Sequence, residues 1–418
     1  MWQVLICIVF ALGVICYSIF FTTSKYTSPE YDGYSEAHMP MILAAVVVSI
    51  FGALNGWKWS VMEKGMIQGI SRSMQANLIL LTVGILVSTW KAAGIIPSII
   101  YYGLNIISPG FFLVTACLLC SIISLVIGSS YTTAGTIGVA MVGIAIGLGI
   151  NPALAAGAVV AGAYTGDKMS PMSDTTNMAP AVSGSNVFEH IRHMVYTVTP
   201  SYIIALVLYF ILGRSAAPDG AVQMEMKDTL QNAIQEEFTV SPFLMLPIVF
   251  LLIAVILKVP ALPAMFGGVV MGLLCMGFVQ GIRFADFFDI MHYGYISSSA
   301  GVELTNGYTV ADVVGGGGFN GMLWTVSIVL CSMSFAGVLE ATGMLGSVVE
   351  KTNGLLVMTT VLTCFFINLL TADQYLSIIL PGRMYKTAFE DRRLKNKNLS
   401  RCLEDSGTLT SPLIPWNV

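Results

Sequence analysis

Residues 149–182 read GINPALAAGAVVAGAYTGDKMSPMSDTTNMAPAV, and this stretch decides the fold. Its first part is a run of small apolar residues, and its second part gathers acids, hydroxyls and an amide around Pro171. A proline cannot donate the helical hydrogen bond to the carbonyl four residues earlier, which here belongs to Asp167. Backbone freed in this way survives at membrane depth only against protein or a water-filled cavity. The stretch therefore predicts a broken transmembrane helix that offers oxygen ligands to a hard cation such as Na⁺.

The composition of the whole chain supports a membrane protein. Of its 418 residues, 56% are hydrophobic and 10% are charged, whereas soluble domains carry about 25% charged residues. Segments of about 20 apolar residues predict an all-α polytopic protein with about eleven spans, counting broken ones. The good candidates are 1–21, 76–94, 109–128, 195–213, 241–258, 260–280, 321–339 and 355–371. Shorter or interrupted runs lie at 39–55, 133–149, 152–165 and 374–382. The bilayer is thus an expected partner, whereas a net charge of −4 without a basic block excludes nucleic acid.

An internal duplication is indicated by matches between the two halves. Shifting the sequence by 244 residues pairs Cys120 with Cys364, Ser124 with Asn368, Ser129 with Asp373, Tyr131 with Tyr375 and Gly138 with Gly382. Further along, Ser170-Pro171 is repeated as Ser411-Pro412. Because the matches keep their order, they predict two copies of one unit.

The duplication defines three regions. We expect an N-terminal transmembrane repeat at 1–213, a flexible or extramembrane hydrophilic linker at 214–240, and a C-terminal repeat at 241–418. Segments 57–75 and 187–194 are expected to be amphipathic helices at the membrane surface. The stretch 383–401 carries seven Lys or Arg residues against two acids, which predicts a cytoplasmic location.

Four polar breaks form the candidate ion site. In the first copy the candidate ligands are Ser129, Ser130, Thr133, Asp167, Ser170, Asp174, Thr175 and Asn177. In the second copy they are Asp373, Asp405, Thr408, Ser411 and Asn417. The second copy's Pro412 and Pro415 are expected to free the carbonyls of Thr408 and Ser411. Two alternatives stay open: the acids lie in solvated loops, and the hydroxyls only bond back to helix carbonyls.

A carboxylate inside the membrane is costly and is functional by default. Loss of water favours the protonated form of a carboxyl group, whereas a bound cation favours the carboxylate. Such a site holds a proton or a cation but not both, which is the mechanism of an antiporter. We expect Asp167, Asp174 or Asp405 to carry the exchanged proton.

Other chemistry finds less support. The pair His190 and His193 could suggest a metal, but an interfacial helix explains the segment better. No nucleophile and base stand together, so an enzyme is not expected, and no cofactor is implied. A passive channel would not need titratable acids. Lys91 and Glu340 occupy matching repeat positions, where they either form an ion pair or reach out from helix ends.

Several long motifs resemble the NhaC-type sodium/proton antiporter family. They are IGSSYTTAGTIG (127–138), the opening stretch 149–182, HIRHMVYT (190–197), ADQYLSIILPGRMY (372–385) and NLSRCLEDSGTLTSPLIPWN (398–417). The resemblance runs over nearly the whole chain. It implies that the two repeats are inverted, with re-entrant hairpins and broken helices around a shared site.

The resemblance also implies a function. It points to Na⁺ or Li⁺ expelled against entering protons across a bacterial plasma membrane, by a chain that could also form a homo-oligomer. Na⁺-coupled exchange of a small carboxylate, of the malate/lactate type, is the alternative, with Arg192 or Lys168 meeting the substrate's charge. Because the chain stops within the second polar motif, we expect a truncated C-terminus.

Overall fold

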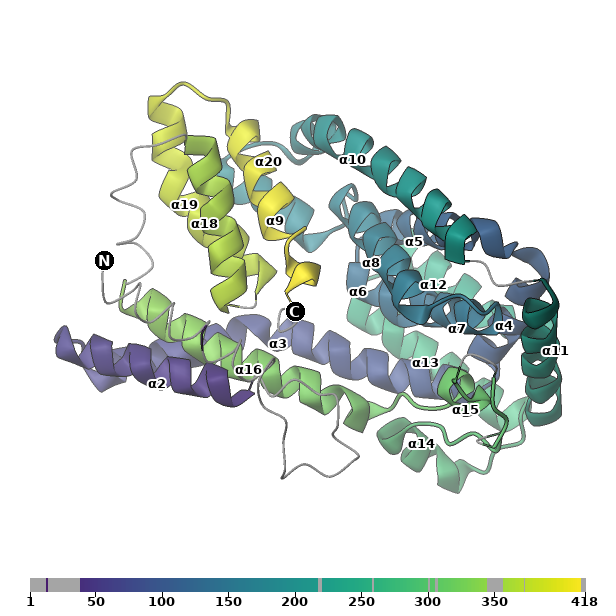
Figure 1. The fold of residues 1–418 in the computed structure, drawn as a ribbon. Coiled ribbons are helices and arrows are strands. Elements are labelled where there is room, and N and C mark those ends of the chain that lie inside the picture. The colour runs from purple at the N-terminus through teal and green to yellow at the C-terminus, as the bar shows by residue number, and fades with distance from the viewer. Residues whose placement is uncertain are drawn as a thin grey trace. The chain divides into compact units, whose positions relative to one another are not determined.

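Helices form nearly all of the ordered structure in the computed structural model (Figure 1). It describes residues 13, 38–216, 220–257, 259–299, 301–304, 307–343, 356–371 and 373–414. Within these ranges, strand-like pairing is limited to two isolated bridges, Tyr295 with Gly316 and Glu303 with Thr309. The all-α prediction is confirmed. The span predicted at 1–21 lies, apart from residue 13, outside the described residues.

In chain order, the helices are α2 (His38–Leu54), α3 (Trp59–Ala92), α4 (Ile95–Ile106), η2 (Pro109–Phe111), α5 (Phe112–Ile127), α6 (Ser130–Thr133), the π-helical segment η3 (Ala134–Gly138), α7 (Val139–Gly147), α8 (Pro152–Lys168), α9 (Asp174–Ser183), α10 (Val187–Ala216), α11 (Gly220–Glu237), η4 (Pro242–Met245), α12 (Leu246–Ile256), α13 (Ala261–Phe278), η5 (Phe284–Asp286), α14 (Phe287–Tyr293), α15 (Val310–Val314), α16 (Phe319–Ala341), α18 (Leu356–Thr371), α19 (Gln374–Asp391), α20 (Asn396–Gly407) and η6 (Ser411–Leu413).

In the described residues, six helices are long and apolar enough to cross a membrane. They cover Trp59–Ala92, Pro109–Ile127, Ser130–Gly147, Val187–Ser215, Ala261–Phe278 and Phe319–Ala341. A pair bent by 96°, Met224–Glu237 with Pro242–Ala254, gives a seventh candidate. These helices fit a polytopic membrane protein, while the count of about eleven spans stays a prediction.

Two local expectations are corrected. The predicted surface helices 57–75 and 187–194 are the first turns of the long helices α3 and α10, and each continues into an apolar span without a break. The polar stretch 214–240 contains the helix α11, whose buried face includes Leu230 and Ile234. Apolar spacing along α11 gives that helix a packing face, so most of the stretch is helical. The location of the stretch outside the membrane stays a prediction.

The chain divides into two compact units. Unit 1 comprises Met1–Asn77, Met178–His190 and Trp324–Val418, and unit 2 comprises Leu78–Asn177 and Ile191–Leu323. Unit 2 has one continuous apolar core that includes Trp90, Phe112 and Ile144. In unit 1, α18, α19 and α20 pack against one another (Figure 1).

The helix boundaries of the two copies agree under the 244-residue shift. The shift carries α5 (Phe112–Ile127) onto α18 (Leu356–Thr371), and the span Ser130–Gly147 onto α19 (Gln374–Asp391). Even the loop after each pair matches, because Gly149 and its counterpart Arg393 both have a left-handed backbone, with φ of 73° and 56°. Arg393 is the one non-glycine residue with positive φ in the described chain. Local structure is therefore repeated; the inversion of the copies stays a prediction.

Small residues bring α5 and α8 close together in unit 2. A Cβ atom on Gly162 would lie 2.2 Å from the carbonyl oxygen of Cys117, and one on Gly166 would lie 2.2 Å from that of Ser121. Ser121 donates to the Gly162 carbonyl at 3.1 Å, and Ser124 donates to the Ala163 carbonyl at 2.5 Å. Close backbone approach and cross-helix hydroxyl bonds are typical of membrane helix pairs. They fix the C-terminal end of α8, where Asp167 lies.

Candidate ion-binding site

The first break lies between α5 and α6 in unit 2. Gly128 ends α5 in a left-handed conformation, with φ of 70°. Ser129 then caps α6, because its hydroxyl accepts from the Thr132 amide at 3.3 Å. The π-helical segment η3 follows α6 directly. Such segments are rare and are frequent at functional sites.

The second break lies between α8 and α9, around Pro171. Helix α8 ends at Lys168 and α9 begins at Asp174, so the predicted interruption is confirmed. The expectation of a free Asp167 carbonyl is wrong. This carbonyl accepts from the Ser170 amide at 2.9 Å and from the Thr176 hydroxyl at 3.3 Å. Nearby polar groups satisfy the backbone that the proline leaves unpaired.

The two breaks of unit 2 are in direct contact. A Cβ atom on Gly128 would lie 2.7 Å from the carbonyl carbon of Met172, so only glycine permits this approach. Across the contact, the Ser130 amide donates to Asp167 Oδ2 at 3.1 Å. Asp167 is only 7% exposed, and its carboxylate is held at the junction of both breaks.

Two oxygen atoms at this junction lack partners. The hydroxyls of Ser130 and Ser173 lie beside the Asp167 carboxylate. Nevertheless, Asp167 Oδ1 and Ser130 Oγ are buried without a hydrogen-bond partner in the part of the chain that the structure describes. A buried, unsatisfied oxygen is costly and calls for an explanation such as an ion. Carboxylate and hydroxyl oxygens are ligands that a hard cation accepts.

The other candidates of the first copy have different surroundings. Thr133 donates back to the Ser129 carbonyl at 3.0 Å, which is the alternative anticipated for these hydroxyls. Asn177 donates to the carbonyls of Pro171 and Ser173 and thereby braces the break. Ser170 and Thr175 are buried: the Ser170 hydroxyl accepts from the Met172 amide, and the Thr175 hydroxyl lies 3.2 Å from that of Ser173. Asp174 is exposed.

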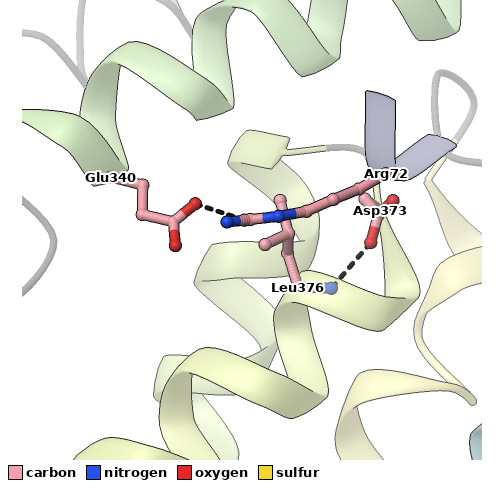
Figure 2. A network of polar contacts seen from close by, with 4 residues as sticks. All are labelled: Arg72, Glu340, Asp373 and Leu376. Carbon is pink, nitrogen blue, oxygen red and sulfur yellow. Dashed lines mark hydrogen bonds and ion pairs between the residues drawn. The ribbon is translucent and has the colours of Figure 1, made fainter. Parts of the chain in front are cut away.

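In unit 1 the first break places Asp373 at the start of α19. Its Oδ1 accepts from the Leu376 amide at 2.6 Å, just as Ser129 caps α6 in the first copy. Asp373 is 6% exposed. Arg72 of α3 forms an ion pair with Glu340 of α16 and interacts electrostatically with Asp373 (Figure 2). The guanidinium group of Arg72 therefore interacts with two carboxylates.

The second break of unit 1 follows α20. The buried carboxylate here is Glu404, whose Oε1 accepts from the Thr408 hydroxyl at 3.0 Å, while Asp405 is half-buried. The Thr408 carbonyl, which was expected to be free, accepts from the Ser411 amide at 3.3 Å. Asn368 bridges α18 to this break through the Gly407 carbonyl and the Thr410 hydroxyl, both at 2.8 Å.

Two further expectations can be placed. Ser411 is buried at the start of η6, whereas Asn417 and Pro415 lie outside the described residues. His190, expected at the surface, is fully buried, because it packs within unit 1 and its Nδ1 hydrogen-bonds with the Ser400 hydroxyl at 2.7 Å.

Acid and hydroxyl change places between the two copies. At the first break, the shift pairs Ser129 with Asp373. At the second, Thr408 stands three residues before Ser411, as Asp167 stands three residues before Ser170. Each copy thus has one acid and one hydroxyl at these two positions, in opposite order.

Sequence reasoning missed Glu404 and the pair of Arg72 with Glu340. The spacing of Glu404 and Thr408 by one helical turn was a usable signal, since residues four apart meet on a helix. Arg72 had no such signal. It lies in the segment interpreted as a surface helix, and its partners are far away in sequence.

Long apolar helices define a polytopic membrane protein, and its buried acids at paired helix breaks form a candidate ion site. The chain belongs to the Na⁺/H⁺ antiporter family, whose profile matches residues 3–176 and 162–418.

Three relatives show how far the similarity extends. The Na⁺/H⁺ antiporter NhaC of Alkalihalophilus pseudofirmus is 38% identical over 92% of this chain and 82% of its own length. NhaC of Bacillus subtilis is 35% identical over 92% of this chain and 84% of its own. The malate-2H⁺/Na⁺-lactate antiporter of Bacillus subtilis is 32% identical over 91% of this chain and 81% of its own.

Proposed function

We propose that this chain exchanges Na⁺ for H⁺ across the bacterial plasma membrane and that the junction of Asp167 and Ser130 is one of its ion sites. The observation that carries the proposal is the buried Asp167 carboxylate with the Ser130 hydroxyl beside it. Among the described residues, Asp167 Oδ1 and Ser130 Oγ make no hydrogen bond of normal geometry. They lie where two helix breaks meet, and broken helices build the ion sites of many transporters. The family, and the names of its NhaC members, supply the ions.

In the proposed mechanism, a single carboxyl group binds either a proton or Na⁺, but not both. A buried carboxylate needs a neutralising partner, and either a proton or Na⁺ provides it. Binding of Na⁺ releases the proton, and binding of the proton releases Na⁺. The Ser130 amide holds Oδ2 in place in both states, so that Oδ1 can face the exchanged ligand. Since each state is neutral at this group, exchange does not require a bare charge to cross the membrane.

The second copy is proposed to complete the site. Its ligands would come from Asp373 at one break and from Thr408, Ser411, Asp405 and Asn417 at the other. Glu404 joins this set because its carboxylate is fully buried beside Thr408. The matching boundaries of α5 with α18, and of the span Ser130–Gly147 with α19, support two equivalent half-sites.

Three further properties belong to the same proposal. The basic stretch 383–401 faces the cytoplasm. Li⁺ is accepted in place of Na⁺, because both are hard monovalent cations. The chain assembles as a homo-oligomer.

Na⁺-coupled exchange of a small carboxylate is a second candidate. It is favoured by the relative named as a malate/lactate antiporter and by the fully buried Lys168, next to Asp167 in sequence. Lys168 or Arg192 would then meet the carboxylate of the substrate.

The test is proton flux in everted membrane vesicles, followed with a pH dye after addition of Na⁺, Li⁺ or K⁺. Na⁺ alone should dissipate the pH gradient, and Asp167→Asn should abolish the response, because the amide cannot exchange a proton for a cation. Asp289→Asn is the matched control, since Asp289 is exposed on α14. A response that requires malate or lactate would favour the second candidate. An undiminished response in Asp167→Asn would refute the assigned site.

A further inference from the structure

Unit 2 contains a cavity of about 290 Å³ that the ion site does not use. Its walls are small and aliphatic and come from η3, α7 and α8, among them Ala134, Val142, Ala156 and Val160. Neither Asp167 nor Ser130 lines it. Ligand pockets are typically such apolar hollows with a few well-placed polar groups.

Two opposite charges line this cavity, Lys91 from α3 and Asp312 from α15. Lys91 is 7% exposed, and its ammonium group donates to the Gly315 carbonyl. Asp312 Oδ2 accepts from the amide and the hydroxyl of Thr309, at 2.7 and 2.8 Å. Both charged groups are therefore held in place by the loop and the short helix at this end of the cavity.

Lys91 and Asp312 attract each other, but no ion pair joins them in the described part of the chain. Asp312 is exposed, and its Oδ1 is accessible to water because it accepts no hydrogen bond from a described residue. A ligand with a single charge would satisfy one of the two groups and face its own sign in the other. A ligand that carries both charges, a short distance apart, would complement both.

We propose that this cavity binds a small zwitterionic amino acid. Its carboxylate lies against Lys91, its ammonium group lies against Asp312, and a short apolar side chain lies against the aliphatic walls. Such a ligand is neutral overall and adds no net charge beside the buried Lys91. It would also contact Ala134 and Gly138 of η3, the segment that continues the helix of Ser130.

Calorimetric titration of the purified, full-length chain tests the proposal with three probes: L-alanine, propionate and ethylammonium. L-alanine should bind at least about tenfold more tightly than either probe with a single charge. Lys91→Met and Asp312→Asn should each weaken L-alanine binding about ten- to hundredfold, the range for one lost charge-assisted contact. Asp312→Asn keeps an oxygen that can accept from Thr309, so the loop should keep its structure.

Matched controls separate this site from general effects of charge. Lys64→Met on the exposed part of α3 and Asp289→Asn on the exposed part of α14 should leave binding unchanged. Ala156→Phe keeps both charges but fills the cavity, and should abolish binding in protein whose thermal melting is unaltered. Equal binding of propionate and L-alanine, unaltered binding in Asp312→Asn, or no heat from L-alanine with folded protein would each overturn the proposal.

Discussion

Ser130 contributes two groups to the proposed ion site, its backbone amide and its side-chain hydroxyl. Its amide anchors Asp167, while its hydroxyl is buried without a partner in the described residues. Ser130→Ala removes only the hydroxyl. We expect the Na⁺ concentration for half-maximal exchange to rise about tenfold, because one polar contact to the ion is lost. The maximal rate should be nearly retained.

The control for Ser130→Ala is Thr165→Val. The Thr165 hydroxyl only bonds back to the Ala161 carbonyl, at 2.7 Å, so its loss should not alter the Na⁺ dependence. Equal effects of the two substitutions would mean that Ser130 does not bind the ion.

Arg72 would compete with Na⁺ at the proposed ligand Asp373, because it carries a fixed positive charge that Glu340 restrains (Figure 2). Glu340→Gln should free Arg72 to pair with Asp373 and so raise the Na⁺ concentration needed for exchange. Adding Arg72→Gln to that variant should restore the Na⁺ dependence. Proton flux against Na⁺ concentration measures both effects. Additive losses in the double variant would contradict this competition, since residues in one network are expected to couple.

The side chains of the candidate site could be predicted only in part from the sequence. The cluster around Pro171 identified Asp167, because proline, acid and hydroxyl stand together in a short apolar context. The sequence could not separate Asp405 from its neighbour Glu404, since only the rotation of α20 buries one of them. Nor could it pair Arg72 with Glu340, because the packing of α3 against α16 decides that contact.

The helix pair α5 and α8 depends on the absence of side chains at its contact. In Gly162→Ala the new methyl group would lie 2.2 Å from the Cys117 carbonyl oxygen. The helices must then separate, at a typical overpacking cost of about 1–3 kcal/mol. We expect a melting temperature lower by several degrees in detergent-solubilised protein, with weakened exchange because Asp167 is displaced.

Gly157 provides the comparison on the same helix. Its nearest neighbour would be the Tyr209 hydroxyl, at 3.8 Å, so Gly157→Ala has space and gains helix propensity. It should melt at the same temperature as the unmodified chain or slightly higher. A fall as large as that of Gly162→Ala would show that the close approach is not what stabilises the pair.

Helix breaks were more predictable than helix lengths. Prolines, and glycine next to hydroxyl residues, identified the interruptions at Gly128 and Pro171. By contrast, α3 and α10 run through segments that were expected to be separate surface helices. Polarity marks where a helix leaves the apolar phase, but a helix can continue through that boundary, and α10 continues even across Pro200.

For the whole molecule, the inversion of the two copies can be tested by labelling. Asn151 caps α8, and the 244-residue shift pairs it with Lys395, which precedes α20. If the copies are inverted, a cysteine at each position lies on opposite sides of the membrane. Lys395→Cys should react with an impermeant maleimide only in everted vesicles, because the positive-inside rule places its loop in the cytoplasm. Asn151→Cys should react only in right-side-out vesicles.

The native cysteines give the baseline for this labelling. Cys117, Cys120, Cys364 and Cys402 are buried, whereas Cys275 and Cys331 are partly exposed, so the labelling of the unmodified chain is subtracted from that of each variant. Reaction of both new cysteines from the same side would contradict inversion and leave a parallel duplication.

For the whole molecule, the class of protein could be predicted from the composition. The duplication could be predicted from sequence matches that keep their order in both halves. The number of spans could not, because interrupted helices such as α8 and α19 are too short or too polar for a count based on apolar length. The sequence also did not indicate the two compact units, which join segments far apart in the chain.

The exchanged order of acid and hydroxyl has a consequence for how such a gene can change. Recombination between the two halves would keep the boundaries of α5 and α18, which already match. Yet copying the first half over the second would replace Asp373 with serine and Thr408 with aspartate. The backbone would tolerate the event while the ion chemistry was rewritten. The two halves therefore share local backbone structure, but neither sequence can replace the other. Each half carries an acid at a position where the other half carries a hydroxyl.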